Sequence, residues 1–198
     1  MLTKSIIKIS VRFLVELMLQ SGDLNSGYFS NSRAMDGIKA HQLISKTSKE
    51  DYKPEVSVSF TAIDGDIQLE INGRIDGVIN SNEGIIIDEI KTTTLPIAFI
   101  SEDFSSLHWA QAKCYAYIYG VKNNLDSLNV RLTYYQIDTC EMKHFFKSMN
   151  IKELERFFFN LIEKYLKRIR AVALWGVSRD ESIKARMSIS TGKFMFSY

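Results

Sequence analysis

The sequence predicts an α/β fold in which a mixed central β-sheet is flanked by α-helices. Three observations support this prediction. Apolar residues recur at helical spacing near both ends of the chain, they alternate with polar residues over 54–71, and three isoleucines stand together at 85–87. The first pattern is typical of amphipathic helices, the second of strands with one buried face, and the third of a strand buried on both faces.

Two helices are expected near the N-terminus. A stripe at helical spacing predicts a helix over 8–20 that stops at Gly22, and the stripe consists of Val11, Leu14, Val15 and Met18. A loop rich in Gly, Ser and Asn over 21–32 should lead to a second helix over 32–44. His41 falls near the end of that second helix.

Three strands are expected next. Alternating apolar residues over 54–60 and 67–71 predict two strands, and Asp64-Gly65 between them is a strong hairpin signal. The segment GIIIDEIK, residues 84–91, lacks a polar face and is the candidate central strand. A short turn over 81–84 would fold it back along the strand that precedes it.

The second half of the chain predicts a helix, a strand and a helix. The first helix covers 106–119, with serines before it as caps and Gly120 as its stop. A strand over 130–138 follows, and Asn150 opens the last helix. Its apolar stripe consists of Leu154, Phe157, Phe158, Leu161, Tyr165 and Ile169.

Length and composition indicate one soluble domain. The chain has 198 residues, 45% of them hydrophobic and 24% charged, and no apolar run approaches the ~20 residues that span a bilayer. The N-terminus lacks the features of a signal peptide. We therefore expect a cytoplasmic protein without a membrane partner. Its two cysteines, Cys114 and Cys140, cannot supply four thiolates, so we expect no iron–sulfur cluster and no disulfide.

Charge is unevenly distributed, although the formal net charge is only +2. Residues 64–103 hold nine acids against Arg74 and Lys91, and residues 164–193 hold eight bases against two acids. The acidic segment could hold a cation, and the basic segment could contact phosphate. The candidate phosphate contacts are Arg168, Arg170 and Arg179, which follow a helix with an apolar stripe.

Asp76, Glu89 and Lys91 form the chemically most informative group. Residues two apart in a strand share a face, so Glu89 and Lys91 project together while Asp88 and Ile90 point away. Carboxylates can hold a divalent cation that neutralises an anionic phosphodiester and activates water. An ammonium group beside them can orient that water or offset the charge that develops on phosphorus.

These residues carry a family resemblance. GRIDGV followed by IIIDEIK resembles the D-(x)n-(D/E)-x-K signature of the PD-(D/E)XK nuclease superfamily. GIKAH, residues 37–41, resembles the GxxxH element of its RecB-like exonuclease branch, and Gln111 with Tyr115 resembles the QxxxY helix of that branch. Many RecB-like nucleases carry four cysteines for an iron–sulfur cluster. This chain departs from that pattern and resembles the cluster-free subset.

The resemblance implies a restriction-endonuclease-like core that binds Mg²⁺ or Mn²⁺. His41, Asp76, Glu89 and the carbonyl of Ile90 would be the metal ligands, and the imidazole makes Mn²⁺ the better fit. The implied catalytic residues are Asp76, Glu89, Lys91, Gln111 and Tyr115. The implied function is DNA hydrolysis by a metal-dependent nuclease, an exonuclease in repair or recombination.

A narrower likeness concerns nuclease domains that precede XPD/DinG-like helicases. It is carried by SIIKISVRFLVELML, LHWAQAKCYAYIYG and RDESIKA. It implies a nuclease domain over 1–175 and makes 176–198 a candidate remnant of a helicase linker, with a helicase as candidate partner. Two other functions stay open: a catalytically silent DNA-binding accessory module of a helicase, and an RNA-processing enzyme on the same fold.

Ordinary structural roles also stay open for the candidate site. Asp76 before a glycine is common in turns, and Glu89 with Lys91 could be a buried salt bridge. A histidine such as His41 is, taken alone, more often a surface residue than a metal ligand. Gln111 and Tyr115 could simply cap and pack.

Overall fold

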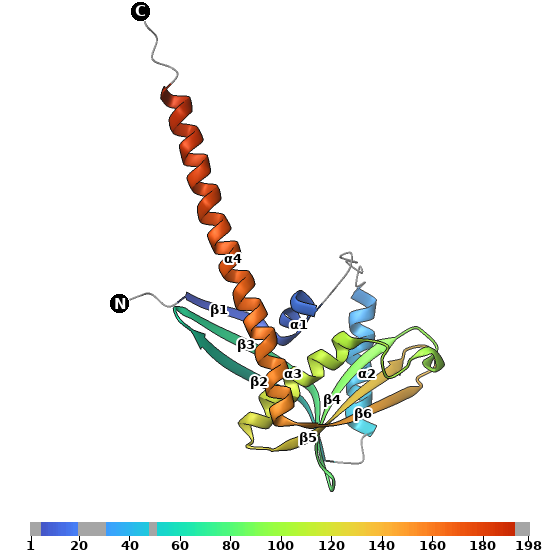
Figure 1. The fold of residues 1–198 in the computed structure, drawn as a ribbon. Helices are drawn as coiled ribbons and strands as arrows, with labels where there is room; N and C mark the ends of the chain where they lie inside the picture. Colours follow the sequence, from blue (N-terminus) through green and yellow to red (C-terminus); the bar gives the residue numbers. More distant parts are fainter. Residues whose placement is uncertain (1–4, 20–30, 48–50, 193–198) are drawn as a thin grey trace, which may run out of the picture.

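The computed structural model describes residues 5–19, 31–47 and 51–192. Its strands are β1 Ser5–Ser10, β2 Asp51–Asp64, β3 Ile67–Ser81, β4 Gly84–Thr93, β5 Ser127–Gln136 and β6 Met142–Asn150. Its helices are α1 Val11–Leu19, α2 Asn31–Thr47, α3 Ser106–Lys122 and α4 Ile151–Gly192, with a short 3₁₀ helix at Ile97–Phe99 (Figure 1).

One mixed six-stranded sheet organises the molecule. Its order is β1-β3-β4-β5-β6, with β2 paired to β3 alongside that path. β1 runs parallel to β3 and β4 runs parallel to β5, whereas the pairs β2–β3, β3–β4 and β5–β6 are antiparallel. β4 therefore lies in the middle of the sheet, as its run of isoleucines predicted, and the predicted mixed α/β fold is confirmed.

The helices cover both faces of the sheet. α1, α3 and the first half of α4 share the main hydrophobic core with Ile87 and with the inner faces of the strands. α2 covers the other face, where Ala40 and Ile44 pack with Ile90 and Tyr135. Adjacent residues of β4 thus face different helices, which places Glu89 on the side of α1 and α3 and leaves Asp88 on the opposite side.

Two tight turns fix the register of the strands around the site. Asp64 pairs with Ile67 at the end of the β2–β3 hairpin, and Gly65 takes the left-handed conformation with φ 62°. Ser81 pairs with Gly84 at the β3–β4 turn, where Gly84 has φ 107°. Both predicted turns are confirmed, and the second one brings Asp76 opposite the end of β4.

The N-terminal helix prediction is correct only in part. A strand occupies 5–10, parallel to the start of β3, and α1 begins at Val11, where the Ser10 hydroxyl accepts the backbone N–H of Phe13 at 3.0 Å. The isoleucines before Ser10 favour a strand, and pairing with a segment sixty residues away stabilises it. The predicted stop at Gly22 and most of the expected loop after it lie outside the described residues.

Gly120 does not end a helix, contrary to the prediction. α3 continues to Lys122 with Asn123 as its C-cap, and Asn124 supplies the left-handed residue with φ 53°. Gly120 is instead a close-packing point, because a Cβ there would lie 2.2 Å from Cδ1 of Ile151. Strand β6 was not predicted. Its apolar residues fall on both faces, so it shows no clean alternation.

α4 is a single helix of 42 residues that leaves the body of the molecule (Figure 1). Asn150 opens it as predicted, because its side chain accepts the N–H of Lys152 at 2.8 Å. Leu154, Phe158, Leu161 and Tyr165 are buried against the core, whereas residues 170–175 are exposed. The helix crosses the expected domain boundary at residue 175 without a break. Over the described ranges, no helix is long and apolar enough to cross a membrane.

Candidate functional site

Asp76 lies where β3 and β4 diverge. The two strands are paired from Ser81–Gly84 to Gly77–Asp88, and Asp76 is the next residue along β3. Its carboxylate Oδ2 accepts a hydrogen bond from the backbone N–H of Ile90 at 2.8 Å. This N–H lies beyond the paired part of the β3–β4 ladder. This contact fixes the Asp76 side chain beside the end of β4, so the ordinary role as a turn residue does not apply.

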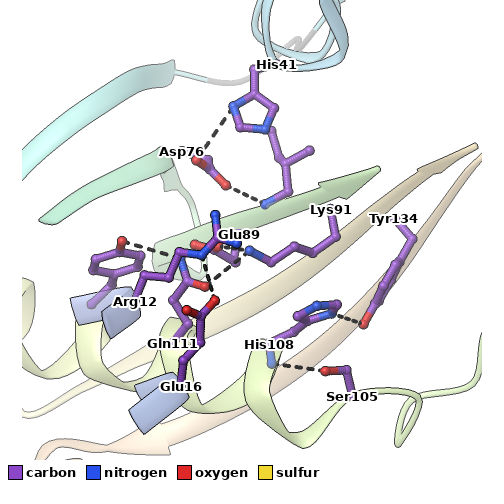
Figure 2. A network of polar contacts seen from close by, with 12 residues as sticks. Arg12, Glu16, His41, Asp76, Glu89, Lys91, Ser105, His108, Gln111 and Tyr134 are labelled. Atoms are coloured by element: carbon purple, nitrogen blue, oxygen red, sulfur yellow. Dashed lines mark hydrogen bonds and ion pairs between the residues drawn. The ribbon is translucent and has the colours of Figure 1, made fainter. Parts of the chain in front are cut away.

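Glu89 and Lys91 project together from β4, as predicted. The ammonium Nζ of Lys91 donates to Oε1 of Glu89 at 2.7 Å and to Oε1 of Gln111 on α3 at 3.2 Å (Figure 2). The Glu89 side chain is 1% exposed and that of Lys91 is 22% exposed. The carboxyl group of Glu89 is therefore buried, and the ammonium group of Lys91 reaches toward solvent.

The second carboxylate oxygen of Glu89 has no hydrogen-bond partner among the residues that the structure describes. Oε2 is buried and receives no hydrogen bond from the described residues. Burial raises the pKa of Glu89 to about 8, although Lys91 opposes the shift, and burial also raises the pKa of Asp76. A structural salt bridge would leave this oxygen unsatisfied at a cost of about 1–3 kcal/mol or more. A bound cation would satisfy it.

Gln111 and Tyr115 form a second layer behind Lys91. They lie one turn apart on α3, and Gln111 Nε2 donates to the hydroxyl of Tyr115 at 3.4 Å. The Tyr115 ring fits over Gly73 of β3, where a Cβ would lie 2.4 Å from Cε1 of the ring. The amide of Gln111 is thereby oriented with its oxygen toward Lys91. The structure brings these two predicted residues to the site.

His41 approaches the site from α2. Its Nδ1 lies 3.6 Å from Oδ1 of Asp76 and 3.9 Å from Oε1 of Glu55, and its side chain is 28% exposed (Figure 2). Among the described side chains, no three His, Cys, Asp or Glu groups are arranged to hold a metal ion. The donor types nevertheless suit Mg²⁺ or Mn²⁺, because the carboxylates of Asp76 and Glu89 and the imidazole of His41 line one pocket.

A pocket of about 410 Å³ joins these residues. Besides the predicted His41, Asp76, Glu89, Ile90, Lys91 and Gln111, it is lined by Arg12, Val15, Glu16, Thr92, Leu107 and His108. Arg12 and Glu16 on α1 form an ion pair at 2.7 Å on the pocket wall. No sequence motif indicated the α1 residues. His108, three residues before Gln111, shares a helical face with it, and that spacing was the available signal.

Asp88 belongs to a separate network on the opposite face of the sheet, as its position in the strand predicted. Arg131 donates two hydrogen bonds to it at 2.9 and 2.7 Å, and the Thr133 hydroxyl donates a third at 2.6 Å. Asp88 is fully buried and its charge is paired with Arg131. This group is a structural ion pair and leaves Glu89 as the acidic residue of β4 that faces the pocket.

The predicted basic residues and the cysteines lie apart from this pocket. Arg168 and Arg170 are exposed on α4, where Arg170 pairs with Asp64 at 2.7 Å. Arg179, further along the projecting helix, contacts Asp180 at 3.1 Å. Cys114 is buried in the core and Cys140 is exposed, and both thiols are free.

Comparison with known proteins identifies the family. The family model described as "PD-(D/E)XK nuclease superfamily" matches residues 15–185, which is most of the chain. The chain belongs to the PD-(D/E)XK nuclease superfamily. The matched range includes both strands that carry Asp76, Glu89 and Lys91 and the helix that carries Gln111, and the observed fold agrees with the family. A nuclease activity dependent on a divalent metal is general in the PD-(D/E)XK superfamily.

Structural comparison finds a solved chain with a similar overall fold. The crystal structure of SSO0001 matches with a TM-score of 0.50 and 18% sequence identity, covering 79% of this chain and 75% of that chain. At this identity the likeness concerns the fold. No curated protein matches the chain significantly.

Proposed function

We propose that this chain is a Mg²⁺- or Mn²⁺-dependent deoxyribonuclease of the RecB-like branch that acts as an exonuclease in DNA repair or recombination. The observation that supports it most directly is the buried, unpartnered Oε2 of Glu89 beside the Lys91 ammonium. Desolvating a carboxylate without satisfying it is costly in a structural element. A bound cation that acts on a phosphodiester would account for the burial of this carboxylate.

The proposed metal ligands are His41, Asp76, Glu89 and the carbonyl of Ile90. Asp76 keeps Oδ1 available because Ile90 occupies its Oδ2, and His41 lies 3.6 Å from that Oδ1. The cation would supply charge neutralisation of the phosphodiester and a more acidic bound water. These ligands come from three elements, α2, β3 and β4, so the folded sheet and α2 together define the site.

Lys91 is proposed to stabilise charge on the reacting phosphate. Its ammonium is held from two sides, by Glu89 at 2.7 Å and by Gln111 at 3.2 Å, and needs little reorganisation to meet an anion. Tyr115 orients Gln111 through the contact at 3.4 Å. In this proposal Gln111 and Tyr115 position the ammonium group.

The central test compares Glu89→Gln and Lys91→Ala with the parent protein. Glu89→Gln removes the ligand charge, so it should weaken Mn²⁺ binding and abolish cleavage of linear DNA. Lys91→Ala should bind Mn²⁺ at least as well, because a competing cation is gone, while cleavage falls roughly 10²–10³-fold. Calorimetry measures binding and a gel assay measures cleavage.

Two matched controls lie outside the pocket. Glu83→Gln in the exposed β3–β4 turn and Lys122→Ala at the exposed end of α3 should leave both readouts unchanged. If Lys91→Ala cleaves at the parental rate, or Glu89→Gln binds Mn²⁺ undiminished, the pair is a structural salt bridge. DNA binding without cleavage by the parent would favour the catalytically silent accessory module, and preference for RNA under identical salt would favour an RNA-processing enzyme.

We further propose that Arg168, Arg170 and Arg179 make non-specific phosphate contacts and that residues 176–198 are a remnant of a helicase linker. The three arginines are exposed along one helix that projects from the nuclease body. Replacing all three with alanine should flatten the salt dependence of DNA binding, by roughly one unit of slope for each lost contact. If the salt dependence of DNA binding keeps its slope, the three arginines face solvent and do not contact DNA.

A further inference from the structure

His108 has a defined place in the wall of the pocket. It lies in the first turn of α3, where its backbone N–H donates to the Ser105 hydroxyl at 3.3 Å. Its side chain lines the same pocket as Glu89 and Lys91. Figure 2 shows the imidazole ring between Tyr134 and the contact of Lys91 with Gln111. The ring is thus beside the reactive groups without being part of the proposed metal ligands.

Tyr134 contacts the imidazole ring of His108. The hydroxyl of Tyr134 and Nδ1 of His108 are 2.8 Å apart, and Tyr134 is 1% exposed. Phe104 and Phe145 pack edge-on against the Tyr134 ring, with centroids 5.8 and 6.1 Å away. These ring contacts pack the phenol in place, and one nitrogen of His108 is engaged with it.

The surroundings of His108 keep the imidazole neutral. Burial, followed by the cations Lys91 and Arg12, lowers the pKa of His108 to about 4. Burial also raises the pKa of Tyr134 to about 12, so its hydroxyl stays protonated. Within the described parts of the chain, the phenol has no other hydrogen-bond partner. A phenol proton directed at Nδ1 of His108 makes that nitrogen the acceptor and places the imidazole proton on Nε2.

We propose that His108 is a further substrate-contacting residue, a neutral imidazole whose Nε2–H donates to a non-bridging phosphate oxygen of DNA, with Tyr134 as the positioning residue that fixes its tautomer. The inference rests on the proposed nuclease function. A neutral donor adds a directed hydrogen bond to a site that already holds the Lys91 ammonium, without adding another positive charge.

The most direct test replaces His108 with Gln or Asn, because the two side-chain amides mimic different nitrogens of the imidazole ring. The amide of Gln reaches about as far as Nε2, so His108→Gln should keep kcat/KM for linear DNA within a few-fold of the parent. The amide of Asn reaches only the position of Nδ1, so His108→Asn should lose roughly 10- to 100-fold in kcat/KM, the worth of a hydrogen bond to a charged acceptor. Both variants should bind Mn²⁺ like the parent by calorimetry. Tyr134→Phe should give a smaller loss, because it frees the tautomer and keeps the donor.

A separate readout uses the parent protein alone. The sequence has three histidines, so ¹⁵N spectra of the imidazoles can be assigned from single variants. His108 should show the Nε2–H tautomer from pH 5.5 to 8, and added inorganic phosphate should shift that resonance. The Nδ1–H form, a charged ring at pH 6, or no response to phosphate would overturn the inference, as would a His108→Asn variant with the parental kcat/KM. If the parent fails to cleave DNA with Mn²⁺, the proposed function fails, and the spectra still decide the state of His108.

Discussion

Metal binding to this site should release a proton from Glu89. Burial raises the pKa of Glu89 to about 8, because one oxygen is bonded only to Lys91 and the other has no partner among the described residues. With that pKa, about 90% of Glu89 is protonated at pH 7 and about 10% at pH 9. A carboxylate must be ionised to ligate a cation, so the proton leaves as Mn²⁺ binds.

The expected magnitude follows from these fractions. Binding at pH 7 should release about 0.9 proton from Glu89, and the affinity for Mn²⁺ should rise about tenfold per pH unit below pH 8 and level off above it. The pKa of Asp76 is also raised by burial, so its contribution has the same sign. Calorimetry at one pH in two buffers with different ionisation enthalpies measures the proton count directly.

Two variants separate Glu89 from other acids. Glu89→Gln cannot release this proton, whereas Glu83→Gln, in an exposed turn, should release as many protons as the parent. A count below about 0.3 at pH 7, or an affinity that is constant from pH 6 to 8, would show that Glu89 is ionised before metal arrives. The reasoning from burial would then be refuted, even if the protein cleaves DNA.

Three further predictions concern stability. Without metal, the raised pKa of Glu89 means that its protonated carboxyl contributes fully to stability below pH 4.5 and that this contribution is lost as the pH rises through about 8. The free energy of unfolding in urea should therefore decline over this pH range, and Glu89→Gln should abolish the decline. Arg131→Met removes the cation that pairs with the buried Asp88, so it should lower the free energy of unfolding in urea by about 3–5 kcal/mol. A loss below about 1 kcal/mol would contradict the buried ion pair. Gly73→Ala places a methyl 2.4 Å from the Tyr115 ring and should cost about 1–3 kcal/mol and slow cleavage, whereas an unchanged melting temperature would mean that the ring has room to move.

Local patterns in the sequence were sufficient for most of the fold. The isoleucines of 85–87 predicted a central strand because a segment without a polar face must be covered on both sides. Asp64-Gly65 predicted the β2–β3 hairpin because glycine adopts positive φ without strain. The same alternation rule placed Glu89 and Lys91 on one face and Asp88 on the other, and the hydrogen bonds agree.

Interactions between distant segments decided what these patterns could not. Strand β1 depends on pairing with β3, and Gly120 is needed where α3 meets Ile151, so neither role is visible in a short window of sequence. β6 has apolar residues on both faces and carries no local signature. It exists because the edge of β5 offers a ladder of unpaired backbone groups.

The candidate site divides in the same way. The sequence by itself determined which residues are candidates for the chemistry, namely two carboxylates, a lysine and the motifs around His41 and Gln111. Only the tertiary structure decided their electrostatic state. Desolvation depends on what covers a group from every side, so the unpartnered oxygen of Glu89 and the neutral ring of His108 arise when α1, α3 and the sheet close around them.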